Sequence, residues 1–153
     1  MGTALRWIVM WAGVSLLASF VLVGTDTALL HAIDIPNEAS GGFFQSLGYN
    51  LVWFMKALIL FVAIALLVAF IVAEIIARFL PVRLRTPAMA FAGLLAIPVL
   101  FLAMKQAFFG VDILAGSRDW VGYAVQAVVS GGLMGALFGW LTRRRRRSRY
   151  AVD

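Results

Sequence analysis

The sequence contains no cysteine and a single histidine, His31. The lack of cysteine excludes disulfide bonds, thiolate metal ligands, cysteine-held iron–sulfur clusters and cysteine nucleophiles. One histidine cannot supply both axial ligands of a bis-histidine haem. The G-x-S-x-G, Walker A, H-E-x-x-H and Rossmann glycine patterns are missing as well. We therefore expect no enzymatic activity, no catalytic residue and no cofactor. Asp34 and Glu38 follow His31 at a spacing that fits no metal-ligand pattern, so we expect no metal site either.

Charge is also scarce, at 13% of residues, where a soluble domain carries about 25%. The chain is 63% hydrophobic, with a mean hydropathy of +0.98. The net charge of +6 is concentrated at one end, where residues 143–149 hold six arginines. The charges of the remaining basic and acidic residues cancel one another. Because no basic groove exists elsewhere, nucleic acid is not an expected partner.

The sequence contains several long runs without charged residues. Residues 57–73 contain no charged or strongly polar side chain, and as a helix this run is about 26 Å long, close to the thickness of a bilayer's hydrocarbon core. The predicted spans cover residues 7–25, 51–79, 87–109 and 120–141. This pattern predicts one all-α, integral membrane four-helix bundle over residues 1–142 and a basic tail over 143–153. A signal peptide is the alternative for the first run, which is longer than the usual apolar region of about 7–15 residues.

Polar residues suggest where these spans begin and end. Asp26 is expected to mark the outer end of the first span. Thr86 and Pro87 suit the capping and first helical positions of the third span. Ser117 or Asp119 can cap the fourth span.

The arginines predict the orientation of the chain. With a cytoplasmic N-terminus, most basic residues fall on the cytoplasmic side and most acidic residues on the other, as the positive-inside rule expects. Tryptophans 7, 11 and 140 then lie near the inner interface. We expect both termini to be cytoplasmic, in a bacterial cytoplasmic membrane. The basic tail should bind anionic lipid headgroups or, as an alternative, an acidic partner. Its arginines are Arg143, Arg144, Arg145, Arg146, Arg147 and Arg149.

The fourth span carries a strip of small residues at every fourth position: Ala127, Gly131, Gly135 and Gly139. Such strips let membrane helices approach closely. Packing inside the bundle is the favoured interpretation, and contact with a second copy or another membrane protein is the alternative. A weaker strip on the third span is the expected internal partner, formed by Ala88, Ala92 and Ala96.

Four polar residues fall on the first and fourth spans. Gln126 and Ser130 lie one turn apart on the fourth span, as do Ser15 and Ser19 on the first. We expect hydrogen bonds between these pairs to tie the two spans together. The alternative is a polar strip that faces a substrate path.

Glu74 is the only acid inside a predicted span. Arg78 follows four residues later, in the favourable order for a helical ion pair. We expect an ion pair at the membrane interface, with a transport carboxylate as the alternative.

The sequence thus predicts a small multi-pass membrane protein that serves as an accessory or structural subunit, packed against a membrane partner or a second copy. A small oligomeric transporter or channel is the alternative. It would use Glu74 or the group formed by Gln126, Ser130, Ser15 and Ser19.

Overall fold

The computed structural model describes residues 2–32, 42–110, 114 and 118–149, without the side chains of Thr3 and of residues 143–149. These parts of the chain are helical and form no strand. The elements are α1 (Thr3–Ala32), α2 (Phe43–Ala77), the 3₁₀ turn η1 (Val82–Leu84), α3 (Arg85–Ala107), α4 (Trp120–Gln126), the π-helical segment η3 (Ala127–Gly132) and α5 (Leu133–Arg149).

Four helical stretches in the described chain are long and apolar enough to cross a membrane. They cover Ala4–Ala32, Phe43–Ala77, Val82–Ala107 and Trp120–Thr142, and the last combines α4, η3 and the first part of α5. The prediction of a small all-α protein with four such helices is confirmed. The boundaries are wider than the sequence suggested, and the backbone of α5 continues into the predicted tail as far as Arg149.

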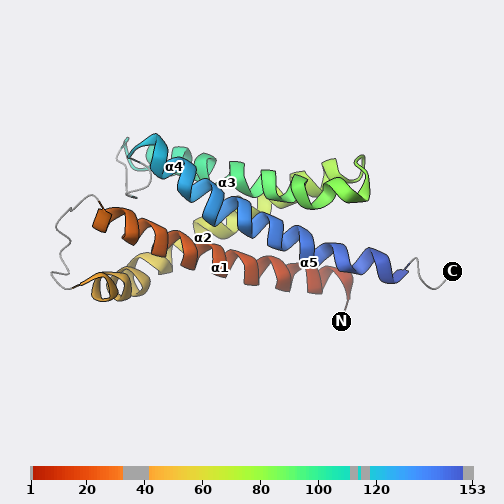
Figure 1. The fold of residues 1–153 in the computed structure, drawn as a ribbon, viewed down its shortest axis with the longest axis horizontal. Helices are drawn as coiled ribbons and strands as arrows, with labels where there is room; N and C mark the ends of the chain where they lie inside the picture. Colours follow the sequence, from red (N-terminus) through yellow and green to blue (C-terminus); the bar gives the residue numbers. More distant parts are fainter. Residues whose placement is uncertain (1, 33–41, 111–113, 115–117, 150–153) are drawn as a thin grey trace.

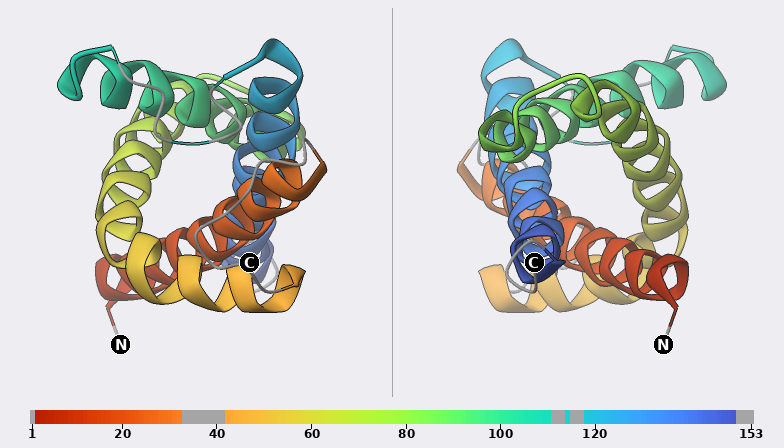
Figure 2. Two further views of the ribbon diagram at one scale, coloured as in Figure 1. Left: turned by 90° about the vertical axis from the view of Figure 1, so that its left-hand side faces the viewer. Right: turned by 90° about the vertical axis from the view of Figure 1, so that its right-hand side faces the viewer.

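The helices form a closed ring in which each contacts the next. α1 packs on α2, α2 on α3, and α3 on η3 and α5, while α4, η3 and α5 return to α1 (Figure 1). The start of α1 and the end of α5 lie at the same end, called the proximal end below. The first turns of α2 run across the opposite, distal end, and its later turns run along the bundle (Figure 2). Residues 43–49, which precede the predicted span 51–79, form the start of α2 itself.

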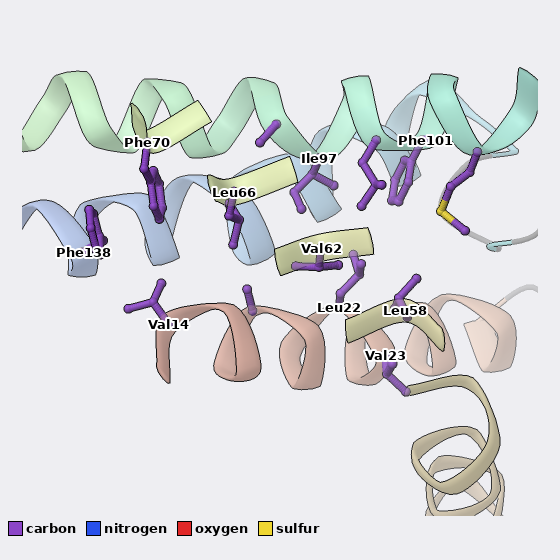
Figure 3. Close-up of a cluster of buried hydrophobic side chains, with 14 of the residues drawn as sticks. Val14, Leu22, Val23, Leu58, Val62, Leu66, Phe70, Ile97, Phe101 and Phe138 are labelled. Atoms are coloured by element: carbon purple, nitrogen blue, oxygen red, sulfur yellow. The ribbon is translucent and has the colours of Figure 1, made fainter. Parts of the chain in front are cut away.

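The proximal half of the core is aromatic. The rings of Phe70 and Phe138 stack with centroids 4.3 Å apart, and Trp7 meets Phe138 edge-on at 5.4 Å. Figure 3 shows Phe70 beside Phe138, with Val62 and Leu66 following along α2. All four of these α2 and α5 side chains are fully buried. Trp11 donates its indole N–H to the carbonyl of Ala63 on α2, at 3.2 Å.

The outside of the bundle is apolar along its length. Only 22–39% of the residues in the most apolar window of each span are buried inside the bundle. Large side chains such as Leu60, Val68 and Val99 are more than half exposed. A water-soluble bundle would place polar residues on such outer faces, whereas lipid accepts apolar ones. The four helices are therefore those of a multi-pass membrane protein.

The third and fourth spans begin in different ways. Asp119 caps α4, because its carboxylate accepts a hydrogen bond from the amide of Gly122 at 2.7 Å. The expected cap at Thr86 is wrong: η1 leads directly into α3, which starts at Arg85, so Thr86 and Pro87 both lie in its first turn. Proline is tolerated there because the first amides of a helix have no partner within the helix.

Candidate functional site

Asp26 does not end the first span. α1 continues through it to Ala32, and the Asp26 side chain is only 8% exposed. The neighbouring threonines satisfy their own hydroxyls within the helix: Thr25 donates to the carbonyl of Val21, and Thr27 to that of Val23. Because such bonds remove the need for water, this polar stretch can remain helical inside the bundle.

Asp26 is joined to the fourth span by Gln126. The side-chain amide Nε2 of Gln126 donates to Oδ1 of Asp26 at 3.1 Å, and Gln126 is fully buried. The sequence predicted that the first and fourth spans would be tied together through Ser15 and Ser19. The two spans are tied, but through Asp26, while Ser19 donates to the Ser15 carbonyl of its own helix at 2.8 Å.

A strip of buried polar side chains therefore lies between the two spans. We call it the polar strip, and its members are Ser15, Ser19 and Asp26 on α1, Gln126 on α4 and Ser130 on η3. On α1 the strip extends for about 17 Å, since each helical residue adds about 1.5 Å. By the same measure Asp26 lies about 12 Å from the middle of its span, and a hydrocarbon core centred on that span would extend about 15 Å to either side.

Three polar atoms of the strip have no hydrogen-bond partner in the described protein: Oγ of Ser15, Oε1 of Gln126 and Oγ of Ser130. Each belongs to a side chain that is at most 1% exposed. A buried polar atom without a partner costs about 1–3 kcal/mol, so native proteins rarely leave one unsatisfied. Three such atoms lie in one strip, and bound water is the usual partner of buried polar atoms of this kind.

The fourth span changes from an α-helix to a π-helix beside the polar strip. Between Ala127 and Gly132 it is π-helical, and the amide of Leu133 donates to the carbonyl of Val128, five residues earlier. Ser130 lies within this wider turn. Single π turns in otherwise α-helical segments are often found at functional sites, because they are less stable than the α-helix that would replace them.

The glycine strip faces a different side of the fourth span. A β-carbon built at Gly131 would collide with the Gly93 carbonyl of α3, and one built at Gly135 would collide with the carbonyl of Met89. Gly139 contacts Thr86 and Met89, and Ala127 is also buried. The face of α3 that receives the strip thus lies one residue away from the expected alanines 88, 92 and 96.

Glu74 and Arg78 take no part in the polar strip. Oε2 of Glu74 pairs with Nη2 of Arg85 at 2.6 Å, across the turn between α2 and α3. The expected partner, Arg78, is exposed. The chain reverses between the two helices, and this brings Arg85 at the start of α3 next to Glu74 in the last turn of α2.

Two predicted features lie partly or wholly outside the described residues. The side chains of Arg143–Arg147 and Arg149 are not described, although their backbone belongs to α5. Asp34, Glu38 and Ser117 also lie outside the described residues. Among those that are described, no group of three histidine or acidic side chains is placed to hold a metal ion.

Sequence reasoning missed Asp26 and a nearby bond from Asn50 Nδ2 to Thr27 Oγ1 at 3.1 Å, which ties α2 to α1. A signal was present: Asp26 follows Ser19 by seven residues and Ser15 by eleven, spacings that keep all three on one helical face. The apolar residues after Asp26 also allowed a longer helix.

Comparison of the chain with protein-family models, with curated proteins and with solved structures finds no match.

Proposed function

We propose that the protein is a small membrane transporter or channel whose path follows the polar strip. The observation that carries this proposal is the hydrogen bond between Gln126 and the buried carboxylate of Asp26. Ionisable side chains inside a membrane are costly and commonly mark ion or substrate pathways. The unpartnered oxygen atoms of Ser15, Gln126 and Ser130 support the same interpretation, because a strip kept only for packing has no use for acceptors left free.

The strip is a better candidate than Glu74, the other acid considered for transport. Glu74 is paired with Arg85 close to the proximal end, and this pair neutralises its charge locally. The strip instead reaches from near the distal end to the middle of the bundle.

An accessory role, in which the protein packs on a membrane partner or a second copy, is the competing proposal. Its main support in the sequence was the glycine strip. Because α3 covers Gly131 and Gly135 within the same chain, this strip offers no free surface for a partner. The accessory role then depends on the outer, lipid-facing surface of the bundle.

We further propose that the protein lies in a bacterial cytoplasmic membrane with both termini in the cytoplasm and with its C-terminal arginines on anionic headgroups. The support is the distribution of basic residues, since Arg6, Arg78, Arg83 and the tail all belong to the proximal end. A reporter enzyme that is active only outside the cytoplasm, fused after Asp153, should stay inactive. Activity of that fusion would reverse the proposed orientation.

Reconstitution of the full chain into liposomes tests the transport proposal. Fluxes of protons, sodium, potassium and a small uncharged solute are measured against protein-free vesicles. We expect one of these fluxes to exceed the background, and Ser130→Ala to reduce it. Gln106→Leu is the matched control, because Gln106 is exposed on α3 and far in sequence from the strip.

Two results contradict the proposal. One is a set of fluxes that all equal those of protein-free vesicles, measured with protein shown by circular dichroism to be folded. The other is a flux that Ser130→Ala and Gln106→Leu change equally. Co-purification of a stoichiometric membrane protein, together with absence of flux, would favour the accessory role.

A further inference from the structure

The second helix is longer than the hydrocarbon core of a bilayer is thick. α2 runs from Phe43 to Ala77, and its 35 residues make a helix about 52 Å long, against about 30 Å for the hydrocarbon core. Figure 2 shows where the excess lies: the first turns of α2 run across the distal end of the bundle. We call residues 43–53 the distal segment. The later residues, 54–77, are about 36 Å long as a helix and can cross the bilayer on their own.

Two contacts with α1 fix the level of the distal segment. Nδ2 of Asn50 donates to Oγ1 of Thr27 at 3.1 Å, and the ring of Phe43 meets that of His31 with centroids 5.6 Å apart. Thr27 and His31 lie about 14 and 20 Å from the middle of the first span, Ala4–Ala32. A hydrocarbon core centred on that span would end about 15 Å from its middle. The distal segment is therefore at the level where hydrocarbon meets the lipid headgroups.

The exposed side chains of the distal segment are those expected at a membrane interface. Ser46 is buried against the bundle, whereas Phe44 is 84% exposed and Trp53 and Tyr49 are at least half exposed. Residues 42–55 contain no charged side chain. A surface helix in water carries charged and polar residues on its exposed side. Aromatic residues instead gather where headgroups meet hydrocarbon, because tyrosine and tryptophan combine an apolar ring with a polar atom.

An independent observation comes from the end of α3, which lies at the same distal end (Figure 1). Phe109 has a left-handed backbone with φ of 57°, and its side chain is 99% exposed. The amide of Gly110 donates to the carbonyl of Lys105 at 2.7 Å. In a helix end of this kind the left-handed position is usually glycine, because a β-carbon is unfavourable there. No side chain in the described parts of the chain covers Phe109, so its cost must be offset by a contact outside the chain.

We propose that residues 43–53 form an interfacial helix, which lies in the plane of the membrane in the leaflet at the distal end. Phe109 and the largely exposed Trp120, at the start of α4, enter the same lipid layer from the other helices. The partner of this aromatic surface is the phospholipid bilayer, because the surface continues the lipid-facing sides of the four spans at one end. Its rings hold the bundle at a fixed depth. The proposal does not depend on whether the protein transports a solute.

Single cysteines that carry a spin label test the depth of the distal segment in vesicles of phosphatidylcholine and phosphatidylglycerol. The full chain contains no native cysteine, so no other residue needs to be replaced. Labels at Gln45, Gly48 and Val52 occupy exposed positions on one helix face. Collisions of each label with oxygen, which enters hydrocarbon, and with a water-soluble nickel chelate report its depth. Labels at the exposed residues Leu60 and Val68 give the hydrocarbon reference, and free label in buffer gives the water reference.

We expect the three labels of the distal segment to give the same collision ratio, between the hydrocarbon and water references. A helix that enters the membrane directly would place Gln45 and Val52 about 10 Å apart in depth. A steady change of the ratio from one label to the next would therefore overturn the proposal. So would nickel collisions as frequent as in buffer, which would place the segment in water. Few collisions with either reagent would show that a protein, such as a second copy, covers the segment, and would also overturn it.

A second measurement tests whether the aromatic rings hold the segment in place. With the label at Gly48, Phe44→Gln combined with Trp53→Gln should shift the collision ratio toward the water reference. Val68→Ala removes an exposed apolar side chain from the span itself and should leave the ratio unchanged. Circular dichroism in the same vesicles shows that each variant is folded. An unchanged ratio in the folded double variant would overturn the role of the rings.

The label can also be placed at the end of α3, in Phe109→Cys. Cysteine requires the same left-handed backbone as phenylalanine, so this exchange adds no strain. We expect its collision ratio to equal that of the label at Gly48, because both belong to one lipid layer. A ratio equal to that of free label in buffer would overturn the common layer of α2 and α3.

Discussion

The carboxylate of Asp26 accepts a hydrogen bond from the side-chain amide of Gln126, which follows it by 100 residues in the chain. This contact joins the first and fourth spans and closes the ring of helices. It also places a carboxylate inside the bundle rather than at its end. The same bond thus has a structural consequence and a functional one, and the two can be separated by experiment.

Gln126→Leu is expected to lower the free energy of unfolding by about 1 kcal/mol, because buried Asp26 loses a donor and hydrogen bonds inside membranes contribute about 0.6 kcal/mol on average. Unfolding in mixed micelles by a denaturing detergent measures the change. A double-mutant cycle with Asp26→Leu should give a coupling free energy of about 0.5–2 kcal/mol. Gln106→Leu is the control and should be near neutral. Equal stability of Gln126→Leu and wild type would show that the bond does not hold the spans together.

Gly131→Ala should destabilise the protein by about 1–3 kcal/mol, because the added β-carbon would collide with the carbonyl of Gly93 and force the fourth span away from α3. Gly13→Ala is the matched control. A β-carbon at Gly13 would meet nothing within 4 Å, so this exchange should raise helix stability by about 0.5–1 kcal/mol. Unfolding curves of the two variants should therefore shift in opposite directions. A similar shift of both in one direction would contradict the close contact with α3.

Arg85→Gln should lower stability by about 1–3 kcal/mol, since Glu74 would lose a charged donor at 2.6 Å. Arg78→Gln is the control suggested by the sequence, and it should change stability by less than about 0.5 kcal/mol. Unfolding of both variants, and of each combined with Glu74→Gln, measures the coupling. Stronger coupling of Glu74 to Arg78 than to Arg85 would contradict the ion pair between α2 and α3. Glu74 would then pair with the residue four positions later in the sequence.

Asp119→Ala should cost about 0.5–2 kcal/mol, because the amide of Gly122 loses its capping acceptor at the start of α4. Asp119→Ser should recover most of this loss, since serine is also a favourable capping residue. Hydrogen exchange of the amides in the first turn of α4 reports the effect locally. Unchanged exchange of the Gly122 amide in Asp119→Ala would show that the cap does not stabilise this helix end.

Helix number and type were readable from the sequence because lipid requires long apolar helices, and 57–73 alone is nearly long enough to span a bilayer. Asp26 was misjudged because a charge normally ends a span. Its burial depends on Gln126, which the sequence places 100 residues away. The partner of Glu74 was missed for a similar reason: Arg78 is near in sequence, but Arg85 is near only after the chain reverses. Tertiary contacts decided both cases.

Deletion of Val129 provides the most direct test of why η3 is π-helical. A π turn holds one residue more than an α-helix needs, so removing one residue from Ala127–Gly132 should let the span run as a continuous α-helix. Gln126 and Gly135 would keep their positions against α1 and α3, and stability should remain equal or rise. Transport should fall, because Ser130 would move relative to Asp26. If the deletion instead lowers the free energy of unfolding and leaves transport intact, the π turn serves packing against Gly93 and not the polar strip.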